Sequence, residues 1–211
     1  MNRVLQFITN GSTPVEVITQ VKEVLEGGCG WIQLRLKEFT DDQIIEVITH
    51  VKPMCEAHGA TLIMNDRVDM AANYNLDGVH LGIDDMPVSE ARNILGDDAI
   101  IGVTANTIEE ILTLCQQPMS YFGIGPMRFT TTKKNLRPEI GLSGYHDIVE
   151  AMRQTGVNKP AVAIGGITIE DVFDLLDLGL WGVAVSGTIA RAPHPKEITK
   201  EFMSIVNKFN S

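Results

Sequence analysis

The sequence predicts an α/β fold, a single-domain (β/α)8 TIM barrel over residues 1–211. Eight short, nearly continuous apolar segments alternate with longer amphipathic segments, and no linker or low-complexity stretch interrupts them. Continuous apolar strands are typical of parallel sheets that are buried on both faces. Eight strand and helix units also fit the usual length of a barrel. An open, doubly wound sheet shares the local pattern and stays an alternative.

The expected strands are the β-branched and apolar runs Val4–Thr9, Trp31–Leu36, Thr61–Asn65, Gly78–Gly82, Ile100–Thr104, Tyr121–Gly125, Ala161–Gly165 and Gly182–Ser186. Helical periodicity between them predicts helices over Pro14–Glu26, Asp41–His58, Thr107–Cys115, Ser143–Thr155 and Thr168–Leu178. Glycine follows most of these segments and marks a helix end. Thr168 and Asp171 have the spacing of a capping box and mark a helix start.

Composition restricts the partners and the compartment. The formal net charge is -10 and the pI is near 4.9, which disfavours nucleic acid and anionic membranes as partners. Any anionic ligand must therefore be bound by a local group of donors. The three cysteines lack disulfide or zinc spacing, and no signal peptide or membrane-spanning run is apparent. We expect a cytoplasmic protein.

Cations follow the second expected strand. Alternation along the strand places Gln33, Arg35 and Lys37 on one face, which is the interior in a barrel. Two cations in that position are costly unless an anion accompanies them, so a diphosphate ligand is the economical interpretation. Pairing of Arg35 and Lys37 with structural carboxylates at the rim is the alternative.

Carboxylates follow the next two strands. Asp66 comes after Asn65, and Asp85 follows the strand that contains His80. Two carboxylates at neighbouring strand ends suit Mg2+, which also binds substrate phosphates. Helix capping is the alternative for both aspartates. We interpret His80 as a packed strand residue rather than a base.

Later strand ends offer hydroxyl groups and glycines. Thr104 ends the fifth strand, and the loop after the sixth strand carries hydroxyls and cations that suit an anion: Arg128, Thr130, Thr131, Thr132 and Lys133. Gly166, Ser186 and Gly187 follow the seventh and eighth strands, where this fold commonly binds phosphate. Tight turns are the alternative explanation of these glycines.

Seven segments at these strand ends resemble the thiamine phosphate synthase family of (β/α)8 barrels: QLRLK, MNDRVD, DGVHLGIDDMP, IIGVTANT, GIGPMRFTTTKK, AVAIGGIT and GVAVSGTI. The resemblance extends over nearly the whole chain. It implies a transferase that joins hydroxymethylpyrimidine diphosphate to hydroxyethylthiazole phosphate with Mg2+. The products would be thiamine phosphate and pyrophosphate.

The resemblance also implies roles for individual residues. Contacts with the pyrimidine diphosphate fall to Gln33, Arg35, Lys37, Asn65, Thr104 and Lys133. Contacts with the thiazole phosphate fall to Thr130, Thr131, Thr132, Gly166, Ser186 and Gly187. Asp66 and Asp85 would hold Mg2+, and the catalytic residues would be Arg35, Lys37 and Lys133.

A dissociative reaction fits this chemistry, because an aminopyrimidine delocalises positive charge at its methylene carbon and no side-chain nucleophile is needed. Two other functions stay open: a thiazole tautomerase, and a non-catalytic barrel that binds a phosphate ligand. Retention of Lys37, Asp66, Asp85 and Lys133 favours the synthase over both. A homo-oligomer is possible through Trp181 and Phe173, although core packing is the simpler explanation of these side chains.

Overall fold

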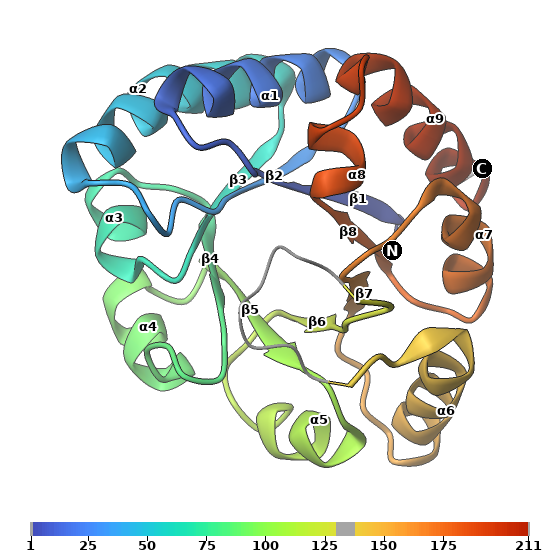
Figure 1. Ribbon diagram of the computed structural model, residues 1–211. Coiled ribbons are helices and arrows are strands. Elements are labelled where there is room, and N and C mark those ends of the chain that lie inside the picture. The colour runs from blue at the N-terminus through green and yellow to red at the C-terminus, as the bar shows by residue number, and fades with distance from the viewer. Residues whose placement is uncertain (1, 130–137, 211) are drawn as a thin grey trace.

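The computed structural model describes residues 2–129 and 138–210. In this part of the chain, eight parallel strands follow one another in chain order around a closed barrel, and β8 pairs with β1. Helices surround the barrel on all sides (Figure 1). The (β/α)8 prediction is confirmed, and the open sheet is excluded because the first and last strands are hydrogen-bonded neighbours.

All eight predicted strands are present: β1 Val4–Ile8, β2 Trp31–Leu34, β3 Thr61–Asn65, β4 Gly78–Leu81, β5 Ile100–Ala105, β6 Tyr121–Ile124, β7 Ala161–Ile164 and β8 Gly182–Val185. The second strand departs from the prediction, since it ends at Leu34 instead of Leu36. Arg35 and Lys37 therefore lie in the loop after β2, at the rim of the barrel.

The helices of the described ranges are α1 Pro14–Glu26, α2 Asp41–His58, α3 Val68–Asn73, α4 Val88–Leu95, α5 Ile108–Leu114, α6 Gly141–Gln154, α7 Ile169–Asp177, α8 Gly187–Ala190 and α9 Pro195–Lys208. Side-chain caps fix several of their starts. The Thr40 hydroxyl accepts the Gln43 N–H at the start of α2. The Asp171 carboxylate accepts the Thr168 N–H at 2.7 Å, so the predicted start of α7 is confirmed.

Apolar side chains pack between the barrel and its helices, and a second, smaller apolar cluster lies inside the barrel. On β2, Ile32 and Leu34 face the helices, whereas Trp31 lies in the separate apolar cluster inside the barrel. At the amino end, the rings of Trp31, Tyr121 and Trp181 contact one another edge to face, with centroids 4.9–6.0 Å apart. Core packing therefore accounts for Trp181, while Phe173 is 53% exposed.

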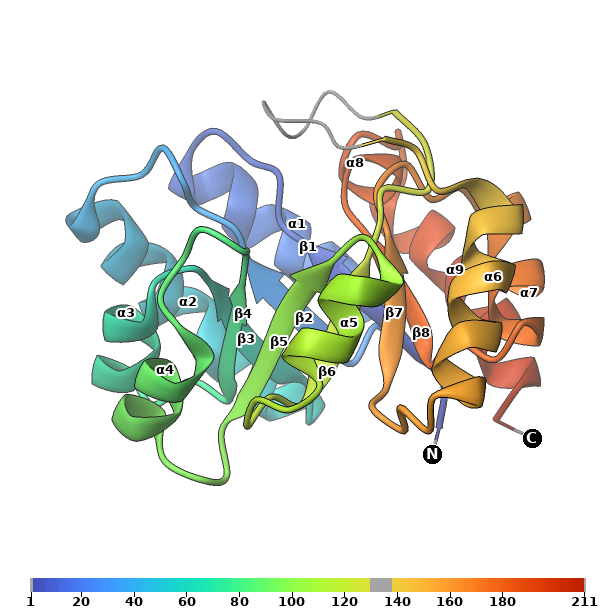
Figure 2. The same ribbon diagram turned by 90° about the horizontal axis from the view of Figure 1, so that it is seen from below.

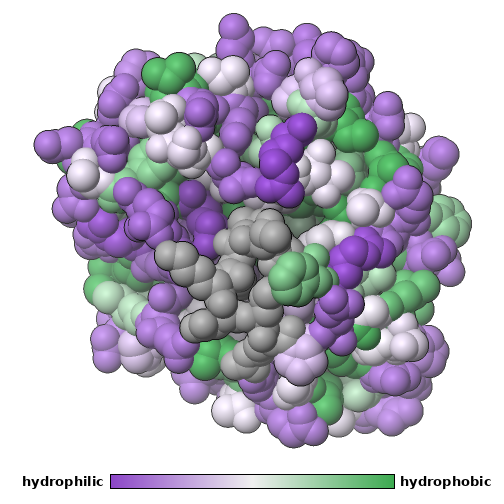
Figure 3. Space-filling view, viewed as in Figure 1, coloured by the Kyte–Doolittle hydropathy of each residue, from purple (hydrophilic) through white to green (hydrophobic). Residues whose placement is uncertain are grey.

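The loops that follow the strands gather at one end of the molecule, opposite the end where the chain enters β1 (Figure 2). The face at that end is mostly hydrophilic, with hydrophobic side chains in small separate groups (Figure 3). Within the described residues, no helix combines the length and the apolar character that crossing a membrane requires. The barrel therefore directs its polar loops toward one shared face.

Candidate active site

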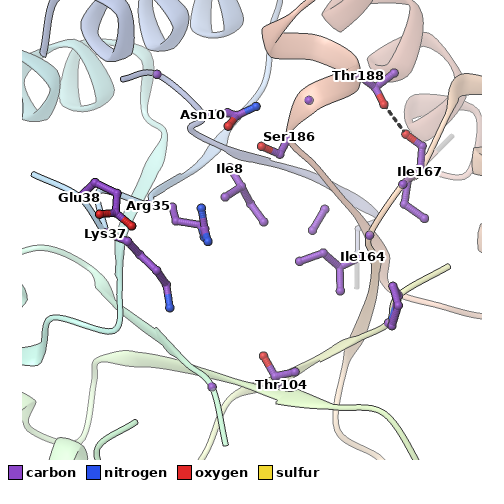
Figure 4. A pocket seen from close by; sticks show the side chains of 18 of the residues that line it. Ile8, Asn10, Arg35, Lys37, Glu38, Thr104, Ile164, Ile167, Ser186 and Thr188 are labelled. Atoms are coloured by element: carbon purple, nitrogen blue, oxygen red, sulfur yellow. Dashed lines mark hydrogen bonds between the residues drawn. The ribbon is translucent and has the colours of Figure 1, made fainter. Parts of the chain in front are cut away.

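A cavity of about 850 Å3 opens among the loops at the carboxyl ends of the strands. Ile8, Ile164 and Ala184 give it an apolar base. Its lining also includes seven of the residues singled out from the sequence: Arg35, Lys37, Asp85, Thr104, Gly166, Ser186 and Gly187. Figure 4 shows Arg35 and Lys37 together on one side of the cavity, Ser186 beside Asn10, and Thr104 at the edge opposite Ser186.

The other predicted residues do not line this cavity among the described residues. Asp66 lies at the rim beside Lys37. Gln33 is only 2% exposed and lies inside the barrel beside the Tyr121 hydroxyl, and Asn65 ends β3. Thr130, Thr131, Thr132 and Lys133 lie outside the described residues. The roles of these four residues stay predictions.

Asp66 and Asp85 meet at the rim, as the sequence predicted. Their carboxyl groups share a hydrogen bond, and Asp85 also accepts the Gly82 N–H at 2.6 Å. Asp66 has a φ of 64°, a conformation that is strained for a residue with a side chain and is concentrated at functional sites. The backbone around Asp66 therefore places its carboxylate against that of Asp85.

The two carboxyl groups have shifted pKa values. Burial is the main cause that raises the pKa of Asp66, and the hydrogen bond with Asp85 raises it further. Burial acts in the same direction on Asp85, but hydrogen bonds from Asp66 and from the Gly82 N–H outweigh it and lower the pKa of Asp85. Neighbouring carboxylates share a proton in this way because they resist ionising together.

Lys37 compensates part of this negative charge. Its Nζ lies 2.8 Å from Oδ2 of Asp66, and its side chain is 48% exposed. The prediction that Lys37 faces the barrel interior is wrong, because β2 ends three residues earlier. The rim pairing considered as an alternative is present, but the partner is the carboxylate predicted to bind a metal.

Arg35 is half-buried and points into the cavity (Figure 4). The Thr9 hydroxyl accepts the backbone N–H of Arg35 at 2.9 Å and fixes the start of the loop. Burial lowers the pKa of Arg35, and the charges of Asp66 and Glu38 oppose that shift. An arginine retains its charge in such surroundings, so the cavity has a permanent cation next to the carboxylate pair.

A chain of hydrogen bonds runs through the barrel beneath the cavity. Nε2 of Gln6 donates to the Tyr121 hydroxyl at 3.0 Å, and this hydroxyl lies 3.0 Å from Nδ1 of His80. Nε2 of His80 lies 3.0 Å from Oγ1 of Thr104. A Tyr121 hydroxyl that donates to Nδ1 would place the ring hydrogen of His80 on Nε2, facing Thr104. The Thr104 hydroxyl is then able to donate into the cavity.

Two glycines leave room for these rings. A Cβ on Gly102 would lie 2.2 Å from Cζ of Tyr121, and a Cβ on Gly123 would lie 2.8 Å from Cε1 of His80. The interpretation of His80 as a packed strand residue is confirmed, since the ring is 5% exposed. Sequence reasoning missed its partners Gln6 and Tyr121, and only the unusual Gly102 and Gly123 within strands signalled them.

Several buried polar atoms at this end have no hydrogen-bond partner within the described residues. They are Nδ2 of Asn65, Oδ1 of Asn106 and Oγ of Ser186. A buried polar atom without a partner costs about 1–3 kcal/mol, and such atoms are uncommon in folded proteins. Their concentration at the carboxyl ends of the strands is the pattern expected where a polar ligand completes the hydrogen bonds.

The loops after β7 and β8 are joined to each other. Oγ1 of Thr188 donates to the Ile167 carbonyl at 2.7 Å (Figure 4). Gly166 has a φ of 72°, which favours glycine, so the tight-turn explanation holds for this residue. Gly166 and Ser186 nevertheless both line the cavity.

Arg128 does not reach into the cavity as an additional cation. Its guanidinium makes two hydrogen bonds with the Asp171 carboxylate, at 2.5 and 2.7 Å, and donates to the Gly166 carbonyl at 2.7 Å. The sequence predicted that Arg128 helps to bind an anion. In the structure the residue instead connects the loop after β6 to the start of α7.

The closed barrel, with cations and carboxylates converging on a polar cavity at the carboxyl ends of its strands, defines a (β/α)8-barrel enzyme. The family model described as thiamine monophosphate synthase matches residues 5–189. The chain belongs to this family.

Individual relatives agree with that assignment. The chain is 47% identical over 201 residues to a thiamine-phosphate synthase of Bacteroides fragilis, covering 95% of this chain and 98% of the relative. It is 44% identical to a thiamine-phosphate synthase of Flavobacterium psychrophilum, with 92% and 94% covered. The solved structure of a thiamine phosphate pyrophosphorylase from Pyrococcus furiosus superposes with a TM-score of 0.85 at 31% identity, over 99% of this chain and 97% of that one.

Proposed function

We propose that the protein condenses hydroxymethylpyrimidine diphosphate with hydroxyethylthiazole phosphate and releases thiamine phosphate and pyrophosphate. The observation that carries this proposal is the presence of Arg35, Lys37 and Asp85 at one cavity, with Asp66 beside them through its ion pair with Lys37 and its contact with Asp85. Fixed cations and a carboxylate pair suit a diphosphate that binds together with a divalent cation. The thiamine-phosphate synthase relatives support the same reaction.

The donor set fits Mg2+. Asp66 and Asp85 supply two neighbouring carboxyl groups, of which Asp66 has a raised pKa and Asp85 a lowered one, and a bound cation favours the ionised form of both. No cluster of three or more metal-binding side chains occurs in residues 2–129 and 138–210. Water and diphosphate oxygens would therefore complete the coordination, which is the usual arrangement for Mg2+. When bound, the metal supplies charge stabilisation for the departing pyrophosphate.

The reaction breaks the bond between the methylene carbon and the diphosphate oxygen, and the electron pair leaves with pyrophosphate. The aminopyrimidine ring delocalises the resulting positive charge, and the thiazole nitrogen then forms the new bond to the methylene carbon. Arg35 and Lys37 bind the diphosphate and stabilise the charge that develops on it. Thr104 donates toward the pyrimidine substrate, and the barrel holds both reactants in line.

The thiazole phosphate is assigned to the loops after β7 and β8. Gly166, Ser186 and Gly187 line this part of the cavity, and the Ser186 hydroxyl lacks a partner among the described residues. Through the family resemblance, Thr130, Thr131 and Thr132 belong to the same thiazole phosphate site, whereas Lys133 belongs to the diphosphate site. Cytoplasmic location is also proposed, and the free thiols of Cys29, Cys55 and Cys115 support it. Homo-oligomerisation stays a prediction.

The test is steady-state release of pyrophosphate from purified protein, with both substrates, with each omitted in turn, and after metal removal by a chelator. Release is expected only with both substrates and Mg2+, and Lys37→Ala is expected to lower kcat at saturating substrate. Asp147→Asn, an exposed substitution on α6, serves as the charge control. Unchanged release from Lys37→Ala would contradict the role of Lys37. Interconversion of thiazole phosphate tautomers without pyrophosphate would favour the tautomerase.

A further inference from the structure

We infer that Arg191 binds the phosphate group of the second substrate, the thiazole phosphate. This inference rests on the proposed function and adds a residue that the sequence analysis did not select. Arg191 directly follows α8 and lines the same cavity as Gly166, Ser186 and Gly187. Its cation is therefore placed beside the loops already expected to hold a phosphate.

The guanidinium of Arg191 lies next to Gly187, on the side where a Cβ would be. A Cβ built on Gly187 would be 2.3 Å from Nη2, 2.5 Å from Cζ and 2.7 Å from Nη1 of Arg191. The guanidinium therefore occupies the space that a side chain at position 187 would need. Gly187 does not have a left-handed backbone, so the position favours glycine because of the space that the guanidinium occupies.

The side chain of Arg191 has no hydrogen-bond or ion-pair partner among the residues that the structure describes. Other arginines are held by the protein: Arg67 pairs with Asp41 and Asp69, and Arg92 donates to a set of backbone carbonyls. A guanidinium has five N–H donors in a planar fork that matches phosphate oxygens. In a chain of net charge -10, a cation kept apart from every described carboxylate and directed to a polar cavity is suited to an anionic ligand.

The surroundings complete a site for one phosphate. Oγ of Ser186, the residue before Gly187, is buried without a partner in the described ranges. One phosphate is able to accept from this hydroxyl and from the fork of Arg191 together, and charge-assisted bonds of this kind are among the strongest in proteins. The Thr188 hydroxyl is already used by the Ile167 carbonyl, so Ser186 and Arg191 are the side-chain donors left at this turn.

Position in the cavity indicates which phosphate Arg191 binds. Arg35 and Lys37 lie together on one side of the cavity and Thr188 on the far side, with Ser186 between them (Figure 4). Arg191 belongs to the Ser186 and Thr188 side through its contact with Gly187. The diphosphate is assigned to the Arg35 side. Loss of Arg191 should therefore weaken binding of the monophosphate substrate selectively.

The first test measures KM and kcat for both substrates in Arg191→Gln and Arg191→Lys. For Arg191→Gln, KM for the thiazole phosphate should rise by about 10- to 100-fold, the range for a lost charged hydrogen bond. KM for the pyrimidine diphosphate and kcat at saturation should change less than about twofold. Arg191→Lys should recover only part of the affinity. Lys200→Gln, which removes one exposed cation on α9, should match the wild type.

The second test uses Gly187→Ala, whose methyl group should displace the guanidinium without straining the backbone. It should raise KM for the thiazole phosphate, and it should add little in the Arg191→Gln background, because both changes remove one interaction. Fully additive effects, or an unchanged KM in Arg191→Gln, would overturn the inference.

Calorimetric titration with the thiazole phosphate separates this inference from the proposed function. Weaker binding to Arg191→Gln than to the wild type supports the role of Arg191 even if no thiamine phosphate forms. Equal binding to both proteins overturns that role even if the wild type is an active synthase. Absence of product from the wild type with both substrates and Mg2+ overturns the proposed function alone.

Discussion

Nε2 of His80 lies 3.0 Å from Oγ1 of Thr104, at the boundary between the barrel interior and the cavity. The other ring nitrogen, Nδ1, faces the Tyr121 hydroxyl, which itself accepts from Gln6. Hydrogen bonds in such a chain constrain one another. A buried residue with no access to substrate thus positions the Thr104 hydroxyl at the substrate site.

Tyr121→Phe should test this chain. The substitution leaves Nδ1 of His80 and Nε2 of Gln6 without their common partner, which should lower the free energy of unfolding by about 1–3 kcal/mol. It should also raise KM for the pyrimidine diphosphate, since Thr104 loses its fixed orientation. Denaturant unfolding and steady-state kinetics measure the two effects. Tyr74→Phe is the control, because the Tyr74 hydroxyl has no hydrogen-bond partner among the described residues. Equal effects from both substitutions would refute the hydrogen-bond chain.

Asp66→Asn should abolish most of the metal-dependent activity while preserving the fold. Asparagine tolerates the left-handed φ of 64° at this position, so the substitution changes charge and leaves the backbone in place. Loss of one carboxylate should reduce kcat/KM by about 100-fold or more at low Mg2+, consistent with several kcal/mol of lost charge stabilisation. A Mg2+ titration of initial rates measures the change. A metal dependence identical to that of the wild type would rule out Asp66 as a ligand.

Gly123→Ala should destabilise the barrel from within. The new Cβ would lie 2.8 Å from Cε1 of His80, and two hydrogen bonds prevent the ring from moving without loss. Overpacking of this kind costs about 1–3 kcal/mol, measurable by denaturant unfolding. Gly30→Ala, where a Cβ would meet no atom within 4 Å, is the matched control. A Gly123→Ala protein as stable as the control would mean that the ring has space to shift.

The Arg128–Asp171 pair should give a pH-dependent contribution to stability. Burial favours a higher pKa for Asp171, but hydrogen bonds from Arg128 and Thr168 outweigh it and lower the pKa below the ordinary 3.8. A carboxyl group whose pKa is lower in the folded protein than in the unfolded protein stabilises the fold. The stabilisation is complete at pH values above the pKa of the unfolded protein, and it is lost as the pH falls through the pKa of the folded protein. Arg128→Gln should lower the free energy of unfolding by about 1 kcal/mol near pH 7, a modest value because the Arg128 side chain is partly exposed to solvent. The difference from the wild type should shrink below about pH 3.8; a constant difference would contradict the assignment.

The sequence predicted the barrel closely because its strands are buried on both faces and therefore stand out as apolar runs. Strand ends were less predictable. The alternation of side chains through Gln33, Arg35 and Lys37 suggests a strand that continues past Leu34, but β2 ends at Leu34. Contacts within one rim, such as that of Asp66 with Asp85, followed from topology alone, since neighbouring strands end side by side.

Contacts that depend on side-chain packing could not be predicted. Tyr121 and His80 are 41 positions apart and meet only because Gly102 and Gly123 leave space inside the barrel. The two arginines Arg128 and Arg191 differ in a way that the local sequence does not show. Arg128 pairs with Asp171, 43 positions away, whereas Arg191 pairs with no described residue. Tertiary structure decides whether an arginine is paired within the protein, and therefore also whether it is available to bind a ligand.

Mass-spectrometric detection of the product tests the central claim most directly. The purified protein is incubated with hydroxymethylpyrimidine diphosphate, hydroxyethylthiazole phosphate and Mg2+, and thiamine phosphate and pyrophosphate are quantified together. The account predicts that both products form in equal amounts and that omission of either substrate prevents formation of thiamine phosphate. Absence of thiamine phosphate from a folded protein that binds both substrates would contradict it.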